Sequence, residues 1–406
     1  MNSQTISPFT FMQTHDFREP VPKLTELLQL LINLNGSDLH ITINTPPRVR
    51  VNGDLCELPD YPILTAEDTK SYAYSVMTHT QKADFEDRHQ IDLSFGIQGL
   101  SRFRVNVFDQ RNGIGIVFRA IPFDIVSIDS LQLPRPLIDL CDRPNGLVLI
   151  TGPTGSGKST TLAALLDKIN RERPVHILTI EDPIEFIHGH KKGCVNQREV
   201  GPNTASFPDA LRASLRQDPD IVLIGEMRDL ETIESALRIA ETGHLTFATL
   251  HTNTAASTVT RIIDVFPANQ QAQVRIQLST VLAGVMCQQL VPKADGSGRV
   301  MAVELMLPNT AIRNNIREDK VHLIQNVMSS GQDQHGMMIL NQSLAHLVTE
   351  GTITFEAACL RSNNVDELRE KLGHLKNTEH VHVPSSETRI RSHTSIHSNN
   401  RAGVFA

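Results

Sequence analysis

The chain has 406 residues, of which 40% are hydrophobic and 20% are charged. This ordinary globular composition leaves room for two or three domains and excludes a fibrous or wholly disordered chain. The formal net charge is −7, and the chain has no tryptophan and only 4% aromatic residues. Nucleic acid is therefore disfavoured as the main partner, because dedicated nucleic-acid binders are usually basic and single-strand binders stack bases on aromatic rings.

The sequence also lacks the features of membrane and secreted proteins. No stretch approaches the ~18 apolar residues of a membrane span, and the N-terminus has neither the basic nor the apolar region of a signal peptide. The five cysteines lie far apart and form no C-x-x-C pair, which excludes a zinc knuckle by spacing and favours reduced thiols. We therefore expect a cytoplasmic protein.

The first residues predict an arm followed by two helices. Residues 1–21 are polar and contain prolines, so we expect a flexible N-terminal arm. Apolar residues recur at helical spacing over 24–36 and again over 64–77. Thr65 is the predicted cap of the second helix, with Asp68 in its first turn.

Alternating residues around these helices predict a small sheet. Strands are expected over 37–44, 46–58 (with a turn at Asn52–Gly53) and 91–121. In the last segment, apolar side chains share one face, whereas Arg102 and Arg104 share the other. We expect one small α+β domain over 22–123, joined by a proline-punctuated linker over 124–136 to the rest of the chain.

From Asn145 the pattern changes to alternating strands and helices. Continuous apolar runs predict parallel strands buried on both faces, over 146–151, 175–180, 220–225 and 245–251. Beyond Thr254 the sequence predicts mostly helix, with one strand-like run over 299–307. The pattern is typical of an α/β nucleotide domain, expected over 137–373 with a helical C-terminal part. The His- and Ser-rich residues 374–406 lose periodicity and predict a disordered tail.

The strongest motif is GPTGSGKS, which matches G-x-x-x-x-G-K-[ST] between a predicted strand and a predicted helix. Glycines let the backbone wrap a phosphate, Lys158 neutralises the β and γ oxygens, and Ser159 offers a hydroxyl to Mg²⁺. The sequence therefore predicts an NTP site. Its expected binding residues are Gly152, Pro153, Thr154, Gly155, Ser156, Gly157, Lys158, Ser159 and Thr160.

Acidic residues follow two of the predicted strands. Glu226 stands where P-loop enzymes usually have an aspartate, and we expect it to polarise a water near the γ-phosphate. A second cluster holds Glu181, Asp182 and Glu185. Because ligands bind at the C-terminal edge of a parallel sheet, both clusters can converge on one Mg-phosphate. The alternative is that these carboxylates merely cap the helices that follow.

Two histidines flank the strand predicted over 245–251. His244 and His251 are expected at its opposite ends, so at most one can sit beside the γ-phosphate. His251, at the C-terminal end, is the better candidate to sense that phosphate. A purely structural hydrogen-bonding role stays open for both.

The arginines of the small domain allow two interpretations. They form either a solvated face or a set that reaches a neighbouring subunit's nucleotide, where an arginine finger is worth ~10³ to 10⁵ in rate. The residues concerned are Arg102, Arg104, Arg111 and Arg119.

Four blocks resemble, in order, the signatures of the secretion-type hexameric ATPases, and within that family those of the PilT-type pilus retraction ATPases. They are GPTGSGKS (Walker A), TIEDPIEF (Asp box), LIGEMRD (atypical Walker B) and TGHLTFATLHT (His box). SDLH, PPRVRVNGDL and SRFRVNVFDQ resemble the family's PAS-like N-terminal domain. AIRNNIRED resembles a C-terminal block associated with retraction, with Asn315 in place of a leucine. The resemblance covers residues 22–373.

The resemblance implies a PAS-like α+β N-terminal domain followed by a RecA-like P-loop domain. Carried over residue by residue, it implies that Ser159, Glu181 and Glu226 hold or place the metal and the water, with Glu226 as catalytic carboxylate. His244 and His251 occupy the two His-box positions. Arg104 and Arg119 are the candidates to reach a neighbour's site.

The resemblance further implies a homohexamer that uses ATP and Mg²⁺ to drive pilus retraction, pilin disassembly and twitching motility. The ring would dock peripherally on an inner-membrane pilus platform protein from the cytoplasmic side, and a second retraction ATPase beside it is an open option. The extra N-terminal domain and tetracysteine element of assembly and type II secretion ATPases are not visible, which favours retraction. Alternatives are a secretion- or conjugation-type ATPase, a DNA translocase, or a nucleotide sensor that does not hydrolyse.

Overall fold

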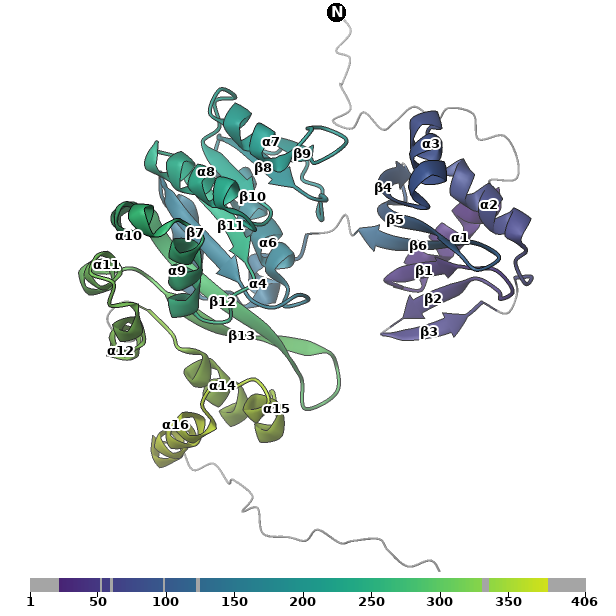
Figure 1. Ribbon diagram of the computed structural model, residues 1–406. Helices are drawn as coiled ribbons and strands as arrows, with labels where there is room; N and C mark the ends of the chain where they lie inside the picture. The colour runs from purple at the N-terminus through teal and green to yellow at the C-terminus, as the bar shows by residue number, and fades with distance from the viewer. Residues whose placement is uncertain are drawn as a thin grey trace, which may run out of the picture.

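The computed structural model describes residues 22–51, 53–58, 61–97, 99–121, 125–330 and 336–378, which form two β-sheets, each with its own helices (Figure 1). The predicted arm lies outside these residues. Most of the predicted tail does too, but its expected start was wrong by a few residues, because helix α16 (Val365–Thr378) runs past Gly373. Among the described residues, no helix combines the length and apolar character needed to cross a bilayer.

The N-terminal sheet has six antiparallel strands in the order β3-β2-β1-β6-β5-β4. Three helices accompany it and pack on one of its faces. The strands are β1 (Asp38–Ile41), β2 (Arg48–Val51), β3 (Asp54–Glu57), β4 (Gln90–Ile97), β5 (Ser101–Gln110) and β6 (Gly113–Ile121). The helices are α1 (Pro22–Asn33), α2 (Ala66–Ser75) and α3 (His79–Arg88).

The six-stranded sheet separates an apolar face from a charged one, as predicted. Phe103, Val105 and Val107 of β5 are fully buried against the helices, while Arg102 and Arg104 lie on the opposite face. The predicted cap is confirmed, because Thr65 and Asp68 form a reciprocal capping box at α2. Helix α3 was not predicted, because it is almost wholly polar and only Phe85 among its residues is buried.

The second sheet has seven strands in the order β13-β12-β7-β11-β10-β8-β9. All neighbours are parallel except β13, which pairs antiparallel with β12. The strands are β7 (Gly146–Thr151), β8 (His176–Glu181), β9 (Cys194–Glu199), β10 (Ile221–Ile224), β11 (Leu245–Leu250), β12 (Leu282–Pro292) and β13 (Arg299–Met306). The four predicted parallel strands and the strand over 299–307 are thereby confirmed.

Strand β12 corrects the expectation of helix in this part of the chain. It lies beside β7 in the middle of the molecule and is buried along most of its length. Gly284, Gln288 and Gln289 interrupt its apolar run, so the pattern does not mark it as a buried strand. The predicted linker also differs, because it contains the short helix α4 (Ile128–Leu131).

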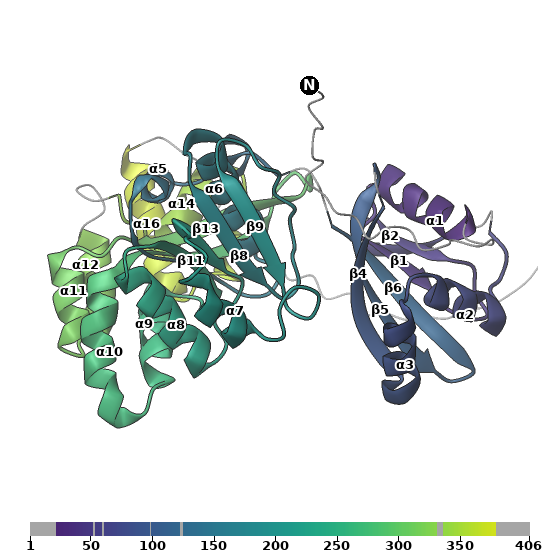
Figure 2. The ribbon, with the colours of Figure 1, turned by 90° about the horizontal axis from the view of Figure 1, so that it is seen from above.

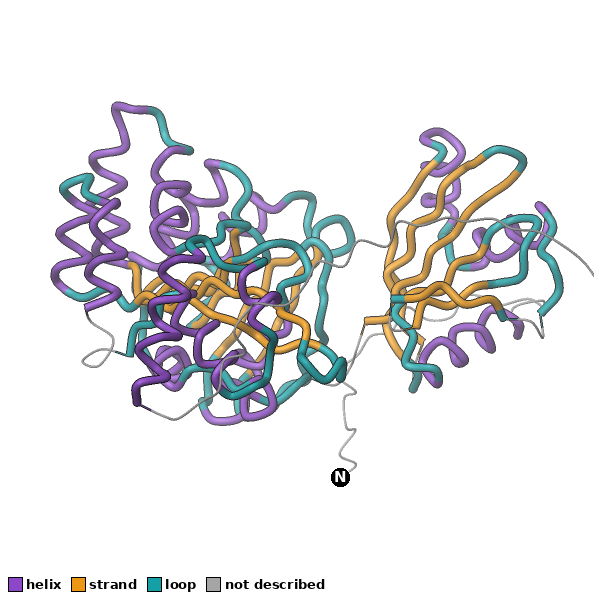
Figure 3. The backbone as a smooth tube through the Cα atoms, turned by 90° about the horizontal axis from the view of Figure 1, so that it is seen from below, coloured by secondary structure: helices purple, strands orange, loops and turns teal. Residues whose placement is uncertain are grey.

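Helices cover both faces of the seven-stranded sheet (Figure 2, Figure 3). Along β7, Leu147 and Leu149 pack with one set of helices, and Val148 and Ile150 with the other. The first set is α7 (Phe207–Ser214), α8 (Leu230–Glu241), α9 (Ala255–Asp264), α10 (Ala268–Val281), α11 (Thr310–Arg317) and α12 (Ile324–Ser330). The second is α4, α5 (Arg135–Asp139) and α6 (Lys158–Glu172).

The C-terminal helices form a small layer of their own at the end of the β12–β13 hairpin (Figure 1). They are α14 (Leu340–Thr349), α15 (Phe355–Cys359) and α16. At the other side of the molecule, the edge strand β9 faces the edge strand β4 of the six-stranded sheet (Figure 2). The two sheets therefore approach each other through their terminal strands.

The cysteines divide into exposed and buried groups. Cys56 on β3 and Cys194 at the start of β9 are exposed, and Cys359 is half-buried. Cys141 and Cys287 are buried, and burial raises the pKa of each thiol to about 12. The two buried thiols are therefore unreactive at neutral pH, since the thiolate is the nucleophile.

Candidate nucleotide-binding site

The P-loop joins the end of β7 to the start of α6 and needs glycine at two of its positions. At Gly152, φ is +140°, and a Cβ would lie 2.2 Å from the carbonyl oxygen of Gln288. Gly157 caps α6 with φ +88°, a conformation that other residues rarely adopt. Lys158 then opens the helix, so its first amides face the loop.

The loop presents a cation and an unpartnered hydroxyl. Lys158 Nζ donates to the carbonyl oxygens of Gly152 (2.9 Å) and Pro153 (3.1 Å). Burial lowers the pKa of Lys158, while the charges of Glu226 and Glu185 oppose this. Ser156 Oγ is buried and has no hydrogen-bond partner within the described part of the chain. An unpartnered donor and a cation beside a helix N-terminus fit a phosphate.

Gln288 braces this loop from β12 and was missed by the sequence analysis. Its side chain is 1% exposed. Nε2 donates to the Ser156 carbonyl (2.7 Å), and Oε1 accepts from the Thr161 hydroxyl (3.0 Å). Gln288 thus ties the loop to the first turn of α6. No local pattern marks it, because its partners lie far away in the sequence.

Glu226 follows β10 and is held between two basic groups. Its Oε1 lies 3.1 Å from His251 Nε2, and its Oε2 accepts a 2.8 Å hydrogen bond from Arg228. Partial burial alone would raise the pKa of Glu226, but the hydrogen bond and charge of Arg228, with a smaller contribution from His251, hold it below its usual value. Glu226 is therefore ionised at neutral pH.

The strand order aligns the candidate residues along one sheet edge. β7, which leads into the P-loop, is followed by β11, β10 and β8, and these strands lead to His251, Glu226 and Glu181 at their C-terminal ends. Of the two acidic clusters, it is Glu226 and the exposed Glu185 whose charges act on Lys158. Both clusters thus lie at the sheet edge that carries the P-loop, with Glu185 exposed there and Glu181 buried.

Glu181 is buried behind this edge. Its Oε1 accepts from the Thr179 hydroxyl (2.6 Å) and from Gln197 Nε2 (3.2 Å), and its Oε2 accepts from the Glu185 backbone N–H (3.4 Å). Burial raises the pKa of Glu181 to about 7 in spite of these bonds. Glu181 therefore anchors the turn that carries Glu185.

The sequence of the chain also matches the model of a known protein family. The model of the type II/IV secretion system proteins matches residues 15–372. The chain belongs to this family. The match confirms the resemblance stated from the four sequence blocks, which include the P-loop and the segments of Glu181, Glu226 and His251.

Three relatives show how close the similarity is. The chain is 49% identical over 335 residues to the type IV pilus retractation ATPase PilT of Pseudomonas aeruginosa, covering 82% of this chain and 96% of that protein. It is 47% identical over 337 residues to a twitching motility protein of Neisseria gonorrhoeae, covering 83% and 89%. The crystal structure of the pilus retraction motor PilT with bound ADP matches with a TM-score of 0.80 and 51% identity, over 87% of this chain and 99% of that one.

The structural match confirms the predicted fold class, a PAS-like α+β domain followed by a RecA-like P-loop domain with a helical C-terminal part.

His244 lies at the N-terminal end of β11, at the sheet edge opposite the P-loop. Its Nδ1 lies 3.0 Å from the Ile239 carbonyl and 3.1 Å from the Thr242 hydroxyl. The structure thus does not bring His244 to this chain's P-loop, and it follows the structural alternative.

The two candidate finger arginines lie on the open face of the six-stranded sheet. Arg104 and Arg119 are directly opposite each other on β5 and β6. Arg119 Nε donates to Asp38 Oδ1 (2.7 Å), and Arg104 is exposed. Neither joins the P-loop cluster of its own chain, and a role at a neighbouring subunit's site stays a prediction.

The AIRNNIRED block forms α11, which is capped by the Asn309 side chain. Arg313 reaches the end of α10 and donates to the carbonyl oxygens of Thr280 and Leu282, each at 3.0 Å. Asn315 is half-buried beside the fully buried Ile316. The departure from the family's leucine therefore sits at the boundary of the buried face of α11 and leaves the core intact.

Proposed function

We propose that this chain is an ATPase motor that retracts type IV pili, working as a homohexameric ring. The observation that carries the proposal is the shared sheet edge, where the P-loop lysine lies within electrostatic reach of Glu226, itself paired with His251. The names of the relatives support it, since one is a pilus retractation ATPase and another a twitching motility protein. A solved relative also holds ADP.

ATP binding would use the P-loop as a phosphate cradle. Lys158 would exchange its carbonyl partners for β- and γ-phosphate oxygens, and the Ser156 hydroxyl would gain the partner that it lacks. The backbone amides at the start of α6 add donors and a favourable dipole. We propose that residues 152–160 form this cradle, with Gln288 holding its shape from below.

Mg²⁺ is proposed as the cofactor of this site. The ion usually keeps several waters and takes few protein ligands beside phosphate oxygens, and the Ser159 hydroxyl in the first turn of α6 fits that role. The magnesium ion would supply positive charge to the phosphates. Glu226 and Glu185 would act on its water shell, with the buried Glu181 holding Glu185 in place.

Hydrolysis would depend on Glu226 as the base. The ionised carboxylate would accept the proton of the attacking water as its oxygen bonds to the γ-phosphorus and the bond to the β–γ bridging oxygen breaks, giving ADP and phosphate. His251, hydrogen-bonded to the same carboxylate, would link its position to the presence of the γ-phosphate. Arg104 and Arg119 would add positive charge from the neighbouring subunit.

The cellular proposal follows from the same relatives. The ring would act on the cytoplasmic side of the inner membrane, bound peripherally to the pilus platform protein, and would remove pilins from the filament base. A second retraction ATPase is proposed as an optional partner. Nucleic acid is not a proposed partner, given the net charge of −7.

The test compares purified wild type with Lys158→Ala and Glu226→Gln, and uses Glu67→Gln on the exposed start of α2 as a control. Wild type and control should hydrolyse ATP with Mg²⁺ in a hexamer-sized species. Glu226→Gln should lose about 10²- to 10⁴-fold in kcat yet still bind ATP, whereas Lys158→Ala should lose binding. Cells carrying either variant should accumulate pili and not twitch.

Retraction by a strain that carries only Glu226→Gln would contradict the motor proposal. ATPase activity that requires DNA, with DNA binding that weakens steeply as salt rises, would instead identify a translocase of the same superfamily.

A further inference from the structure

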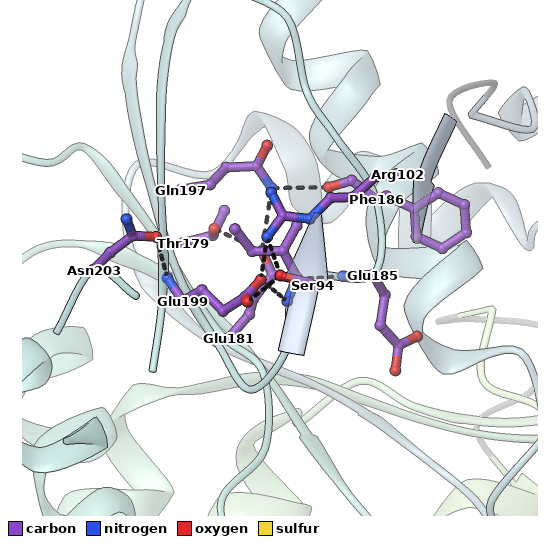
Figure 4. Close-up of polar contacts among 10 residues, drawn as sticks. Ser94, Arg102, Thr179, Glu181, Glu185, Phe186, Gln197, Glu199 and Asn203 are labelled. Carbon is purple, nitrogen blue, oxygen red and sulfur yellow. Dashed lines mark hydrogen bonds and ion pairs between the residues drawn. The ribbon is translucent and has the colours of Figure 1, made fainter. Parts of the chain in front are cut away.

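The two sheets are joined by a buried carboxylate. Glu199 ends the edge strand β9 and is 4% exposed. Its Oε1 accepts from the Ser94 hydroxyl of β4 (2.8 Å), and its Oε2 accepts from Arg102 Nη2 of β5 (2.8 Å). Arg102 Nη2 also donates to Ser94 Oγ (2.7 Å), which closes the triangle (Figure 4).

This contact differs from an ordinary surface ion pair. The Glu199 and Arg102 side chains are 5% and 25% exposed, so the pair is largely removed from water. Loss of one partner would leave an uncompensated charge, a far larger effect than loss of an exposed pair. Arg102 Nε is buried without a hydrogen-bond partner among the described residues. The closed contact therefore leaves one buried donor unsatisfied, which lowers the cost of opening it to water.

Glu199 also holds the turn that leads to the P-loop. Its Oε2 accepts a 3.1 Å hydrogen bond from the backbone N–H of Ile184, the residue before Glu185. Two positions earlier on β9, Gln197 Nε2 donates to the Phe186 carbonyl (2.8 Å) and to Glu181 Oε1 (3.2 Å). β9 thus holds both sides of Glu185, which lies on the turn after β8, at the sheet edge that carries the P-loop.

We propose that Arg102, with Ser94, is a positioning residue for ATP hydrolysis: it latches the N-terminal sheet to Glu199 and so sets the place of Glu185 beside the P-loop. The proposal rests on the ATPase function proposed above. It assigns Arg102 to its own chain's site, whereas Arg104 and Arg119 are candidates for the neighbour's. A change in the angle between the two sheets would then move the turn 182–186 directly.

The contact of Ser94 and Arg102 with Glu199 is called the latch. If the latch positions Glu185, breaking it should lower the rate of turnover without weakening nucleotide binding. In purified full-length protein, Arg102→Ala should lower kcat by about 10- to 100-fold, the effect of displacing a catalytic group by about 1 Å, with the ADP Kd changed less than threefold. Arg102→Lys, which keeps the charge but not the planar fork, should recover part of kcat. Ser94→Ala, a milder change, should give a smaller loss. Arg88→Ala, on exposed α3, is the control.

Amide hydrogen exchange gives a readout independent of activity. In Arg102→Ala, exchange should rise in peptides covering 182–187, where Ile184 loses its ordered acceptor, and stay unchanged in α3. A merely structural clamp would lower the melting temperature but leave kcat and this exchange unchanged in the folded protein.

The outcomes separate the two proposals. Wild-type protein with no ATPase activity under any condition would overturn the proposed function. Active wild type with kcat of Arg102→Ala and Ser94→Ala within twofold would overturn the latch alone. A fall in kcat with unchanged exchange at 182–187 would also overturn it, since the effect would not pass through this turn.

Discussion

At the residue scale, Glu226, the proposed catalytic carboxylate, shows how neighbouring groups set the charge of a side chain. A half-buried carboxylate tends toward a raised pKa, but Arg228 and His251 reverse this. Glu181, a short way along the same sheet edge, has no cationic partner among the described residues, and burial raises its pKa to about 7. Glu226 is thus kept charged, as its proposed role requires, whereas the buried Glu181 accepts hydrogen bonds that hold the turn of Glu185.

Gln288 makes the sharpest prediction for a single residue outside the motifs. Replacing it by leucine leaves the Ser156 carbonyl and the Thr161 hydroxyl buried without partners, at a cost of about 1–3 kcal/mol. We expect Gln288→Leu to weaken ADP binding by about tenfold, because the P-loop loses its brace, as measured by calorimetry. Gln270→Leu on exposed α10 is the control, and unchanged ADP affinity in folded Gln288→Leu would refute the bracing role.

The segment between β8 and β9 buries a titratable side chain. His188 lies in it, buried, and its backbone N–H donates to Gln197 Oε1 (2.8 Å). Burial lowers the pKa of His188 to about 4, the nearby charge of Asp167 being insufficient to offset it. The segment that positions Glu185 therefore depends on an uncharged histidine.

This histidine predicts a loss of stability in acid. Between pH 6.5 and pH 4, the unfolded chain binds a proton at position 188 that the folded chain does not, so folding stability falls as pH falls through this window. At pH 5 the contribution amounts to about 2 kcal/mol relative to pH 7. In urea melts at the two pH values, His188→Gln should lose less stability than wild type. The exposed His79→Gln should behave as wild type, and an equal loss in all three would contradict the prediction.

At the scale of the whole molecule, the nucleotide site and the candidate finger arginines lie on different sheets. Lys158 belongs to the seven-stranded sheet, whereas Arg104 and Arg119 lie on the open face of the other. A site completed by a neighbour requires a head-to-tail contact, which closes into a ring when the rotation allows.

Mixed rings test this arrangement. Lys158→Ala removes the cation proposed to bind phosphate, and Arg104→Ala removes a candidate finger arginine, so each pure variant should be nearly inactive. After co-assembly, roughly a quarter of the interfaces would pair an intact P-loop with an intact Arg104, and ATPase activity should reappear. A mixture no more active than its parts, with mixed rings shown by mass, would exclude action from the neighbouring subunit.

Local features were predictable from the sequence, and long-range ones were not. The P-loop and the Thr65 cap each depend on residues that are close together in the sequence, so their spacing alone identified them. β12 was missed because Gly284, Gln288 and Gln289 interrupt the apolar run that marks the other buried strands. Glu185 could not be preferred over Glu181, since a side chain's direction at a strand end depends on the turn that follows. Glu199 has its partners, Ser94 and Arg102, about a hundred positions earlier.

The distribution of thiols has a practical consequence for watching this molecule work. Cys56 lies on the six-stranded sheet and Cys194 on the seven-stranded one, both exposed, while the buried Cys141 and Cys287 are chemically silent. With Cys359, the half-buried thiol on α15, replaced by serine, a maleimide dye pair would attach preferentially to one site on each sheet. The chain thus supplies two labelling sites of its own, and energy transfer between the dyes would report a change in the angle between the two sheets during turnover.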